Sequence, residues 1–243
     1  MRNIISSFLV NLRYKKLFGK SVSILMYHSI GEGKEFHVVR LEDFKWQMGY
    51  LKDNGFKVIS LAEFVDQIKT GSKIESKTVI ITFDDGYEDN FLSAFPILKK
   101  FGFPASIFLT TGNIDNKKYI NSREVHLPML DWNQIKEMHD SGLIDFEPHT
   151  VSHPKLSEIP SDRAEFEIKN SKSEIEGKLN KKCRFFCYPF GDYSAEVKKI
   201  VSDNFDAAVT VKRGFIGSGS NILELERNSI DSATNKTIFK MKI

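Results

Sequence analysis

The sequence predicts an α/β fold, a distorted (β/α) barrel of about seven parallel strands in a single domain. Short β-rich runs alternate with helical patterns from residue 23 onward. The chain has 243 residues, 41% of them hydrophobic, which is enough for one substantial core. Neither an internal repeat nor a linker divides it. A doubly wound open sheet would give the same alternation, so the pattern favours a barrel only through the number of strands.

The strands follow from β-rich runs that end at turn residues. In chain order they are expected at 23–26, 57–60, 78–83, 105–109, 144–147, 184–188 and 207–210. Helices are expected between them at 42–53, 61–69, 90–101, 132–141, 161–179 and 195–204. In the longest helix Ala164, Ile168 and Ile175 share one face, so it should cover the outside of the sheet. The irregular segment 110–129 is expected to be a surface or active-site loop.

Residues 1–20 are expected to form a basic amphipathic helix ahead of the domain at 21–243. They carry five basic residues and no acidic one, which leaves 30 basic against 32 acidic residues in the rest. A slightly acidic body argues against a nucleic-acid partner. The helix could contact a membrane surface peripherally or pack on its own domain. No run is long enough to span a bilayer and no signal peptide is evident, so a cytoplasmic or membrane-surface location is expected.

Polar residues follow several predicted strands, where parallel α/β folds place their active sites. Asp84 and Asp85 come directly after an apolar strand, and Gly86 allows a sharp turn. Adjacent carboxylates repel each other unless a cation or a shared proton relieves them. One could bind a metal while the other acts as a base, although a solvated Asp-Asp-Gly turn would have the same sequence.

His149 and His153 follow another strand and are four residues apart, which on a helical turn would place both imidazoles on one side. Asp85 with two histidines would leave coordination positions open, as in a catalytic zinc-type site. The two cysteines, Cys183 and Cys187, are too far apart along a strand for a disulfide and are expected to be free core thiols.

The blocks TFDDG (82–86), HTVSH (149–153) and YPFG (188–191) resemble the signatures of polysaccharide deacetylases, carbohydrate esterase family four. The likeness extends to MYHSI (26–30) and LDWNQIKEM (130–138). It implies a distorted βα barrel, an acetylated glycan substrate and one divalent metal ion, zinc in the first place with cobalt or nickel as alternatives. It also implies hydrolysis of an N-acetyl group, or less often an O-acetyl group.

Carried over by position, the resemblance makes Asp84 the catalytic base and Asp85, His149 and His153 the metal ligands. Two departures stand out. Cys187 occupies a position where many members carry arginine, and no histidine follows His153 to serve as the usual late catalytic acid. In a permuted branch, resembling the poly-N-acetylglucosamine deacetylases, an early Tyr-His supplies that acid, and His28 matches it.

Further residues are expected to contact the substrate or support the site: Tyr188, Pro189, Phe190, Gly191, Trp132 and Arg227. A backbone N–H near Phe190 would stabilise the oxyanion, by family resemblance. Trp132 could instead belong to the core, and Arg227 could hold Asp84 in place of the missing arginine or form a surface salt bridge. His37, His126 and His139 are expected to lie on the surface.

The function predicted from the sequence is metal-dependent removal of N-acetyl groups from a sugar or polysaccharide. A carbohydrate O-acetyl esterase would use the same residues. A non-catalytic glycan-binding module is the alternative from another class, and it would not need a free base beside a metal.

Overall fold

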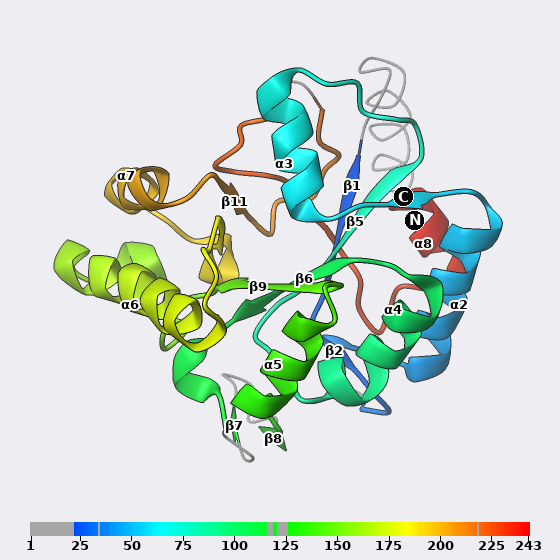
Figure 1. Cartoon of the computed structure of the whole chain (residues 1–243), viewed down its shortest axis with the longest axis horizontal. Coiled ribbons are helices and arrows are strands. Elements are labelled where there is room, and N and C mark those ends of the chain that lie inside the picture. Colours follow the sequence, from blue (N-terminus) through cyan, green and yellow to red (C-terminus); the bar gives the residue numbers. More distant parts are fainter. Residues whose placement is uncertain (1–21, 34, 116–118, 121–125, 218) are drawn as a thin grey trace.

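The computed structural model describes residues 22–33, 35–115, 119–120, 126–217 and 219–243. The predicted helix at 1–20 lies outside these residues. One parallel sheet forms the centre of the fold, in the order β12-β1-β5-β6-β9, with β4 also paired to β5. These strands are β1 (Ser23–Tyr27), β4 (Lys57–Val58), β5 (Thr78–Phe83), β6 (Ala105–Leu109), β9 (Ile144–Pro148) and β12 (Asn228–Ser229) (Figure 1).

Past β9, no backbone ladder among the described residues joins the sheet to the next strand. A side chain of β9 bridges the two strands instead. The next strands, β10 (Phe185–Cys187) and β11 (Ala207–Val209), form a separate parallel pair. Between β9 and β10, the buried carboxylate of Glu147 accepts hydrogen bonds from the N–H groups of Arg184 and Phe185, both 2.9 Å. Burial raises the pKa of Glu147 to about 8, although the nearby Lys181 ammonium opposes this shift. The predicted distorted barrel is confirmed, with a gap in its ladder at this point.

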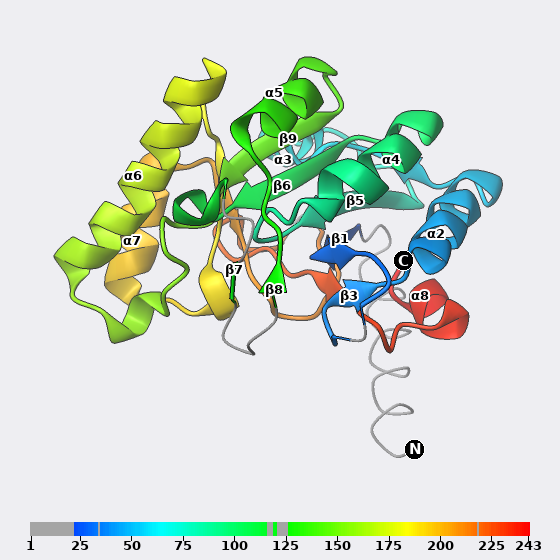
Figure 2. The ribbon, with the colours of Figure 1, turned by 90° about the horizontal axis from the view of Figure 1, so that it is seen from below.

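Helices pack on the outside of the strands: α2 (Leu41–Asp53), α4 (Phe95–Phe101), α5 (Trp132–Asp140), α6 (Ser161–Leu179) and α7 (Ala195–Asn204). The remaining helix of this series, α3 (Leu61–Thr70), packs against the opposite, inner side of the strands. Figure 2 shows α6, α5, α4 and α2 in succession around β9, β6, β5 and β1. Local signals begin several of them. Asp131 and Gln134 form a capping box at α5, and Ser60 accepts the Glu63 N–H at α3. Among the described helices, none has the length and apolarity required to cross a bilayer.

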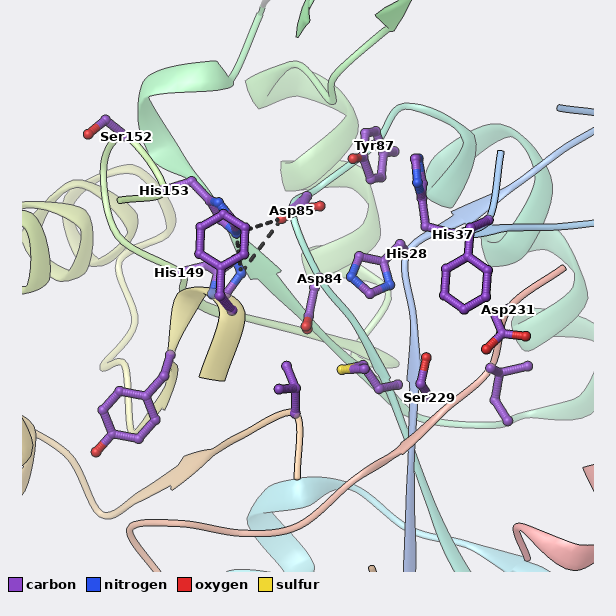
Figure 3. A pocket seen from close by; sticks show the side chains of 16 residues that line it. His28, His37, Asp84, Asp85, Tyr87, His149, Ser152, His153, Ser229 and Asp231 are labelled. Atoms are coloured by element: carbon purple, nitrogen blue, oxygen red, sulfur yellow. Dashed lines mark hydrogen bonds and ion pairs between the residues drawn. The ribbon is translucent and has the colours of Figure 1, made fainter. Parts of the chain in front are cut away.

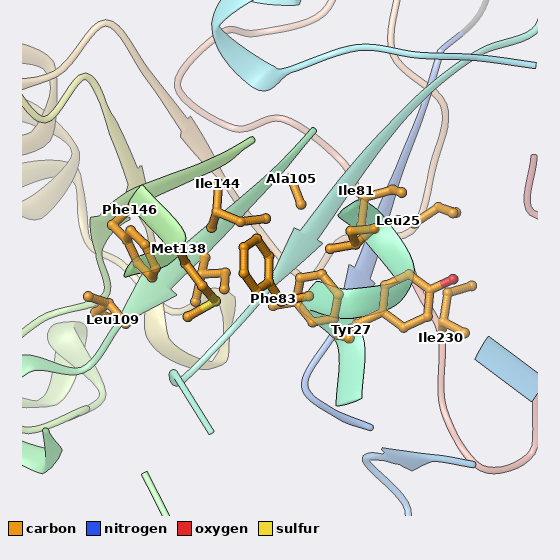
Figure 4. Packing of buried hydrophobic residues seen from close by; sticks show 14 of the residues in the cluster. Leu25, Tyr27, Ile81, Phe83, Ala105, Leu109, Met138, Ile144, Phe146 and Ile230 are labelled. Atoms are coloured by element: carbon orange, nitrogen blue, oxygen red, sulfur yellow. The ribbon is translucent and has the colours of Figure 1, made fainter. Parts of the chain in front are cut away.

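The two-residue alternation of the strands divides the core into two clusters. In β5, Val79, Ile81 and Phe83 face one cluster, which also contains residues of α2, α4, α5, α6 and α7. Figure 4 shows Ile81 and Phe83 in this cluster. Ile80 faces the other cluster. The second cluster also contains Phe108, Phe185 and residues of α3. Because Asp84 continues the alternation of Ile80 and Thr82, its side chain lies on the inner side of the barrel, at the carboxyl end of β5.

The structure adds elements to the predicted order. A short strand, β12, pairs with β1 but was not predicted, because two residues give no periodic signal. The segment expected to be a loop, 110–129, contains an antiparallel pair, β7 (Tyr119–Ile120) and β8 (His126–Leu127). The helix expected at 90–101 begins with a short π-helix (Asn90–Ala94) that leads into α4. Two more short strands, β2 (Ser29–Ile30) and β3 (Val38–Val39), form a pair beyond β1, and α8 (Lys236–Met241) is the last helix among the described residues.

Candidate active site

A cavity of about 580 Å³ opens at the carboxyl ends of the strands. It brings together residues from segments far apart in the sequence (Figure 3). The lining comprises Met26, His28, Phe36, His37, Asp84, Asp85, Tyr87, His149, Ser152, His153, Tyr188, Phe190, Val211, Ser229, Ile230 and Asp231. The predicted base, metal ligands and acid are all among them.

The turn after β5 separates the two adjacent carboxylates. Asp85 has a φ of 73° and Gly86 a φ of 86°, so the chain reverses within two residues. A side chain at Gly86 would place its Cβ 2.7 Å from a methyl of Leu109, and therefore only glycine fits. As a result Asp84 is turned into the barrel at 2% exposure, whereas the side chain of Asp85 is 16% exposed in the cavity.

Asp84 forms a bidentate ion pair with Arg227 in the barrel interior. The guanidinium nitrogens lie 2.7 and 2.6 Å from the two carboxylate oxygens. Arg227 is fully buried and also donates to the Thr210 carbonyl and the Thr82 hydroxyl, at 2.9 and 3.1 Å. Burial alone would raise the pKa of Asp84, but the charge and hydrogen bonds of Arg227 outweigh it and hold that pKa well below its usual range. Asp84 is therefore an ionised carboxylate with a fixed orientation.

Cys187 lies beside this ion pair. Its Sγ is 3.1 Å from Nη2 of Arg227 and 3.6 Å from the Asp84 carboxylate. Both cysteines are free and buried, as predicted. The position of Cys187 thus supplies no arginine to Asp84. Arg227, which follows the last long loop of the chain, pairs with this carboxylate instead.

The two histidines meet across a loop and not on a helical turn. Thr150 and His153 have positive φ values of 69° and 57°, which no helix contains. The Thr150 hydroxyl accepts the N–H of His153 at 3.0 Å. From α6, the fully buried Glu167 carboxylate accepts the N–H groups of Val151 and Ser152, at 2.9 and 2.8 Å. The predicted pairing of the imidazoles is thus present, but the loop and Glu167 produce it.

Three nitrogen and oxygen atoms form a compact triangle in the cavity. The Nε2 atoms of His149 and His153 are 3.2 Å apart, and they lie 3.6 and 3.4 Å from Oδ1 of Asp85. Ligand atoms bound at about 2.0–2.2 Å to a tetrahedral zinc lie roughly 3.3–3.6 Å from one another. The triangle therefore has the size that a zinc-like ion requires.

The protonation of His149 also fits a metal ligand. Its Nδ1 lies 2.8 Å from the carbonyl oxygen of Cys187, so this nitrogen carries the proton and Nε2 presents its lone pair to the cavity. Burial, with the neighbouring His153, lowers the pKa of His149 to about 4. The ring is therefore neutral at pH 7, as metal binding demands.

His28 projects from the end of β1 into the cavity, beside Asp84 (Figure 3). Asn90 fixes the backbone there by donating to the His28 carbonyl at 2.8 Å. The His28 and His37 ring centroids are 6.2 Å apart, and the His37 ring stacks on Tyr87 at 5.8 Å. The expectation that His37 is a surface residue is therefore wrong, because it lines the cavity.

The YPFG block contributes two lining residues, Tyr188 and Phe190. The Phe190 ring packs against His153 with centroids 4.6 Å apart, and its backbone has a φ of 58°. Pro189 and Gly191 shape this turn without lining the cavity. Trp132 does not line it either: the ring packs on the core at the start of α5, with Lys178 Nζ 5.4 Å from its centroid. Arg227 is fully buried behind Asp84, so it supports the carboxylate and is not exposed to a substrate.

Several lining residues were not anticipated from the sequence. Tyr87, Ser229 and Asp231 reach the cavity because β5 and β12 flank β1. Ser229 belongs to the unpredicted β12, and Asp231 follows it. Tyr87 comes directly after the Asp-Asp-Gly turn, which was the one signal that could have identified it.

The sequence of the chain is similar to those of known proteins. The model of the polysaccharide deacetylase family matches residues 71–204. YxkH of Bacillus subtilis is 30% identical over 217 residues, which cover 89% of this chain and 74% of that protein. The poly-β-1,6-N-acetyl-D-glucosamine N-deacetylase of Staphylococcus epidermidis is 31% identical over 171 residues, or 67% of this chain. The match spans 57% of the length of that enzyme.

Solved structures agree with the sequence comparisons. The deacetylase PplD of Streptococcus pyogenes, solved in complex with acetate, superposes with a TM-score of 0.80 at 28% identity. That alignment covers 91% of this chain and 97% of PplD. BC0361, a polysaccharide deacetylase from Bacillus cereus, gives a TM-score of 0.79 at 28% identity, over 92% of this chain and 69% of its own. With the family model spanning more than half of its residues, this chain belongs to the polysaccharide deacetylase family, carbohydrate esterase family four.

Proposed function

We propose that this protein is a metal-dependent N-deacetylase that hydrolyses the acetamido group of a glycan to a free amine and acetate. The observation that carries the proposal is the triangle of Asp85, His149 and His153 beside the ionised Asp84 in one cavity. The named activities of PplD and of the Staphylococcus epidermidis relative are consistent with it.

Asp85, His149 and His153 would hold one divalent cation, which supplies Lewis acidity that acidifies water and polarises a carbonyl oxygen. Zinc is the first choice for two imidazoles and a carboxylate, and cobalt or nickel would also suit this donor set. The triangle is open on the side of the cavity, so a substrate oxygen has access to it.

Asp84 is proposed as the general base. Its carboxylate is ionised at neutral pH and fixed by Arg227, so it can accept the proton of the attacking water without moving. The backbone N–H of Phe190 would donate to the oxyanion that develops on the acetyl oxygen. Phe190 takes this position at the cavity wall through its left-handed backbone conformation.

His28 is proposed as the general acid that protonates the departing nitrogen. An amine leaves as a neutral molecule only when a proton reaches it, because an amide anion is too poor a leaving group. His28 lines the cavity on the opposite side of Asp84 from the metal triangle (Figure 3). Base and acid therefore flank the position where the scissile bond would lie.

The experiment that tests the proposal measures acetate release from matched N-acetylated and O-acetylated oligosaccharides, with zinc or cobalt added to the purified protein. We expect release from the N-acetylated substrates and its loss in Asp84→Asn. Faster release from the O-acetylated set would make the protein an ester hydrolase, and release from neither set would contradict the proposed activity.

A further inference from the structure

His28 occupies a short stretch of backbone between two strands. β1 ends at Tyr27 and β2 begins at Ser29, so neither strand contains His28. On the N-terminal side, the Tyr27 carbonyl accepts the N–H of Asp84 at 3.0 Å, which ties the strand end to the proposed base. The direction of the His28 imidazole therefore depends on what holds the chain at His28 and directly after it.

Two neighbouring side chains hold that stretch of backbone. The Asn90 amide donates to the His28 carbonyl at 2.8 Å. The Ser29 hydroxyl donates to the Asp89 carboxylate. The same carboxylate also accepts a hydrogen bond from the backbone of Ile30. Three consecutive residues are thus bound by two side chains that are themselves adjacent in the sequence.

Asn90 is buried and uses only one half of its amide group. It is 1% exposed, and its Nδ2 lies 2.8 Å from the His28 carbonyl and 3.1 Å from Oδ1 of Asp89. Within the described part of the chain, its own Oδ1 has no hydrogen-bond partner. A buried polar atom without a partner costs free energy, so burial alone does not favour asparagine here. The asparagine is explained by its Nδ2 donor, which fixes the His28 carbonyl.

Asp89 and Asn90 belong to the segment that begins with the two active-site carboxylates. They follow Asp85 by four and five positions, and Asn90 begins the short π-helix that leads into α4. Short π-helices are frequent at functional sites. The backbone between them is braced, since the Leu130 N–H donates to the Gly86 carbonyl at 3.0 Å. The segment that carries the base and a metal ligand therefore also holds the proposed acid.

The charge of Asp89 strengthens its hold on the chain after His28. Burial raises the pKa of Asp89 to about 6, and its hydrogen bonds to Ser29 and the Ile30 backbone oppose this rise. The carboxylate is therefore mostly ionised at neutral pH. Hydrogen bonds to an ionised acceptor are roughly twice as strong as those between neutral groups. Asp89 thus fixes this stretch more firmly than an amide would.

We infer that Asp89 and Asn90 are positioning residues for the proposed acid, because they hold the backbone of His28 and Ser29 at a fixed place relative to Asp84. The inference rests on the proposed function for the role of His28. Neither Asp89 nor Asn90 is among the residues that line the cavity, so both act through His28 and not on the substrate. Their loss leaves the metal ligands in place and impairs the step that needs the acid.

The test measures kcat on an N-acetylated oligosaccharide and on an aryl acetate ester in Asn90→Ala, together with metal content. We expect a loss of about 10-fold on the amide, because a small displacement of a catalytic group slows the step it assists. The loss on the ester should stay below about 3-fold, because its leaving group needs little protonation. The double variant with His28→Ala should lose no more than His28→Ala alone. Equal losses on amide and ester, or losses that multiply in the double variant, would overturn the inference.

Substitutions at Ser29 test the inference even if Asn90→Ala does not fold. Ser29→Ala removes the hydroxyl that binds Asp89 and should lose about 3-fold on the amide alone, whereas Ser29→Thr keeps a hydroxyl and the wild-type rate. Ser106→Ala is the matched control, because Ser106 is an equally buried serine of β6 whose hydroxyl has no partner among the described residues. It should leave both rates unchanged. Equal amide rates in Ser29→Ala and Ser29→Thr would refute the role of Asp89.

A spectroscopic arm separates this inference from the proposed function, because it requires no turnover. In protein that carries isotope-labelled histidine, the imidazole signal of His28 is the one that disappears in His28→Ala. Asn90→Ala and Ser29→Ala should shift or broaden this signal and leave that of His139, on α5, in place. A displaced His28 signal, together with normal deacetylation by His28→Ala, would contradict only the acid role. A His28 signal that stays unchanged in both variants would refute the positioning.

Discussion

Replacing Arg227 should change both the stability of the protein and the pH dependence of its activity. The guanidinium is fully buried, and its contacts to Asp84 are 2.6 and 2.7 Å. Removing one partner of a buried ion pair leaves an uncompensated charge and typically costs about 3–5 kcal/mol of unfolding free energy. We expect a loss of this size for Arg227→Met, and a smaller loss for Arg227→Lys, which keeps the charge but not the bidentate contact.

The effect on pH follows from the same contact. Two charges about 4 Å apart at an effective dielectric constant near 20 interact by roughly 4 kcal/mol, which corresponds to about three pH units. Arg227 lowers the pKa of Asp84, so the ionised carboxylate stabilises the folded protein above the unfolded pKa, and this contribution is lost as the pH falls through the folded value. Without the guanidinium the pKa of Asp84 rises. The acid limb of kcat/KM should then move to higher pH by about one to three units.

The assay records kcat/KM for acetate release from the lowest pH at which both proteins stay folded up to pH 9, together with urea unfolding at pH 7. Arg184→Met is the control, because Arg184 pairs with Asp66 and Asp206 at the partly exposed surface, away from the cavity. It should leave the acid limb in place. If Arg227→Met folds and its acid limb coincides with that of wild type, Asp84 is not the base or Arg227 does not control it.

The remaining predictions concern the metal, the acid, the loop and the N-terminus. His153→Ala should lose the bound divalent ion, which elemental analysis of the purified protein measures; full metal content would contradict the ligand assignment. His28→Ala should keep its metal and lose about 100-fold or more in kcat on an amide, and less on an aryl acetate ester; equal losses would contradict the acid role. Glu167→Ala should weaken cobalt binding about 10- to 100-fold in a visible-absorbance titration, because Glu167 holds the loop between His149 and His153. Glu165→Ala, on the exposed face of the same helix, should not weaken it; equal cobalt affinities of the two variants would show that Glu167 does not position the ligands. Deleting residues 1–20 should abolish binding to anionic vesicles and retain activity on small sugars; an insoluble product would show that this segment belongs to the fold.

The predictable part of the site comes from short motifs. The order of strands and helices follows from apolar periodicity, and Asp84, Asp85, His149 and His153 lie in blocks whose spacing is local. Parallel strands bring their carboxyl ends to one side of the fold, so motifs on β1, β5 and β9 were expected to converge there. The structure places all of these residues around one cavity.

The contacts that support the site were less accessible from the sequence, which offered the pairing of Arg227 with Asp84 only as one of two alternatives and gave no sign of the role of Glu167. Arg227 lies 143 positions from Asp84, and nothing local distinguishes a buried partner from a surface arginine. Glu167 belongs to a helix whose charged residues mostly face solvent, and only the folded loop reveals that its carboxylate accepts backbone N–H groups. The four-residue spacing of the histidines suggested a helical turn, but the positive φ values of Thr150 and His153 show a loop. Spacing therefore predicted which residues meet, and not the backbone that brings them together.

The most direct test of the central claim titrates metal-stripped protein with zinc or cobalt while acetate release from an N-acetylated oligosaccharide is recorded. Activity should rise linearly and reach its plateau at one equivalent of metal. Asp84→Asn should bind the same single equivalent and release no acetate above background, because the ligand triangle is kept and the base is lost. Acetate release from the metal-stripped protein, or wild-type activity in Asp84→Asn, would contradict the assignment of this cavity as a metal-dependent deacetylase site.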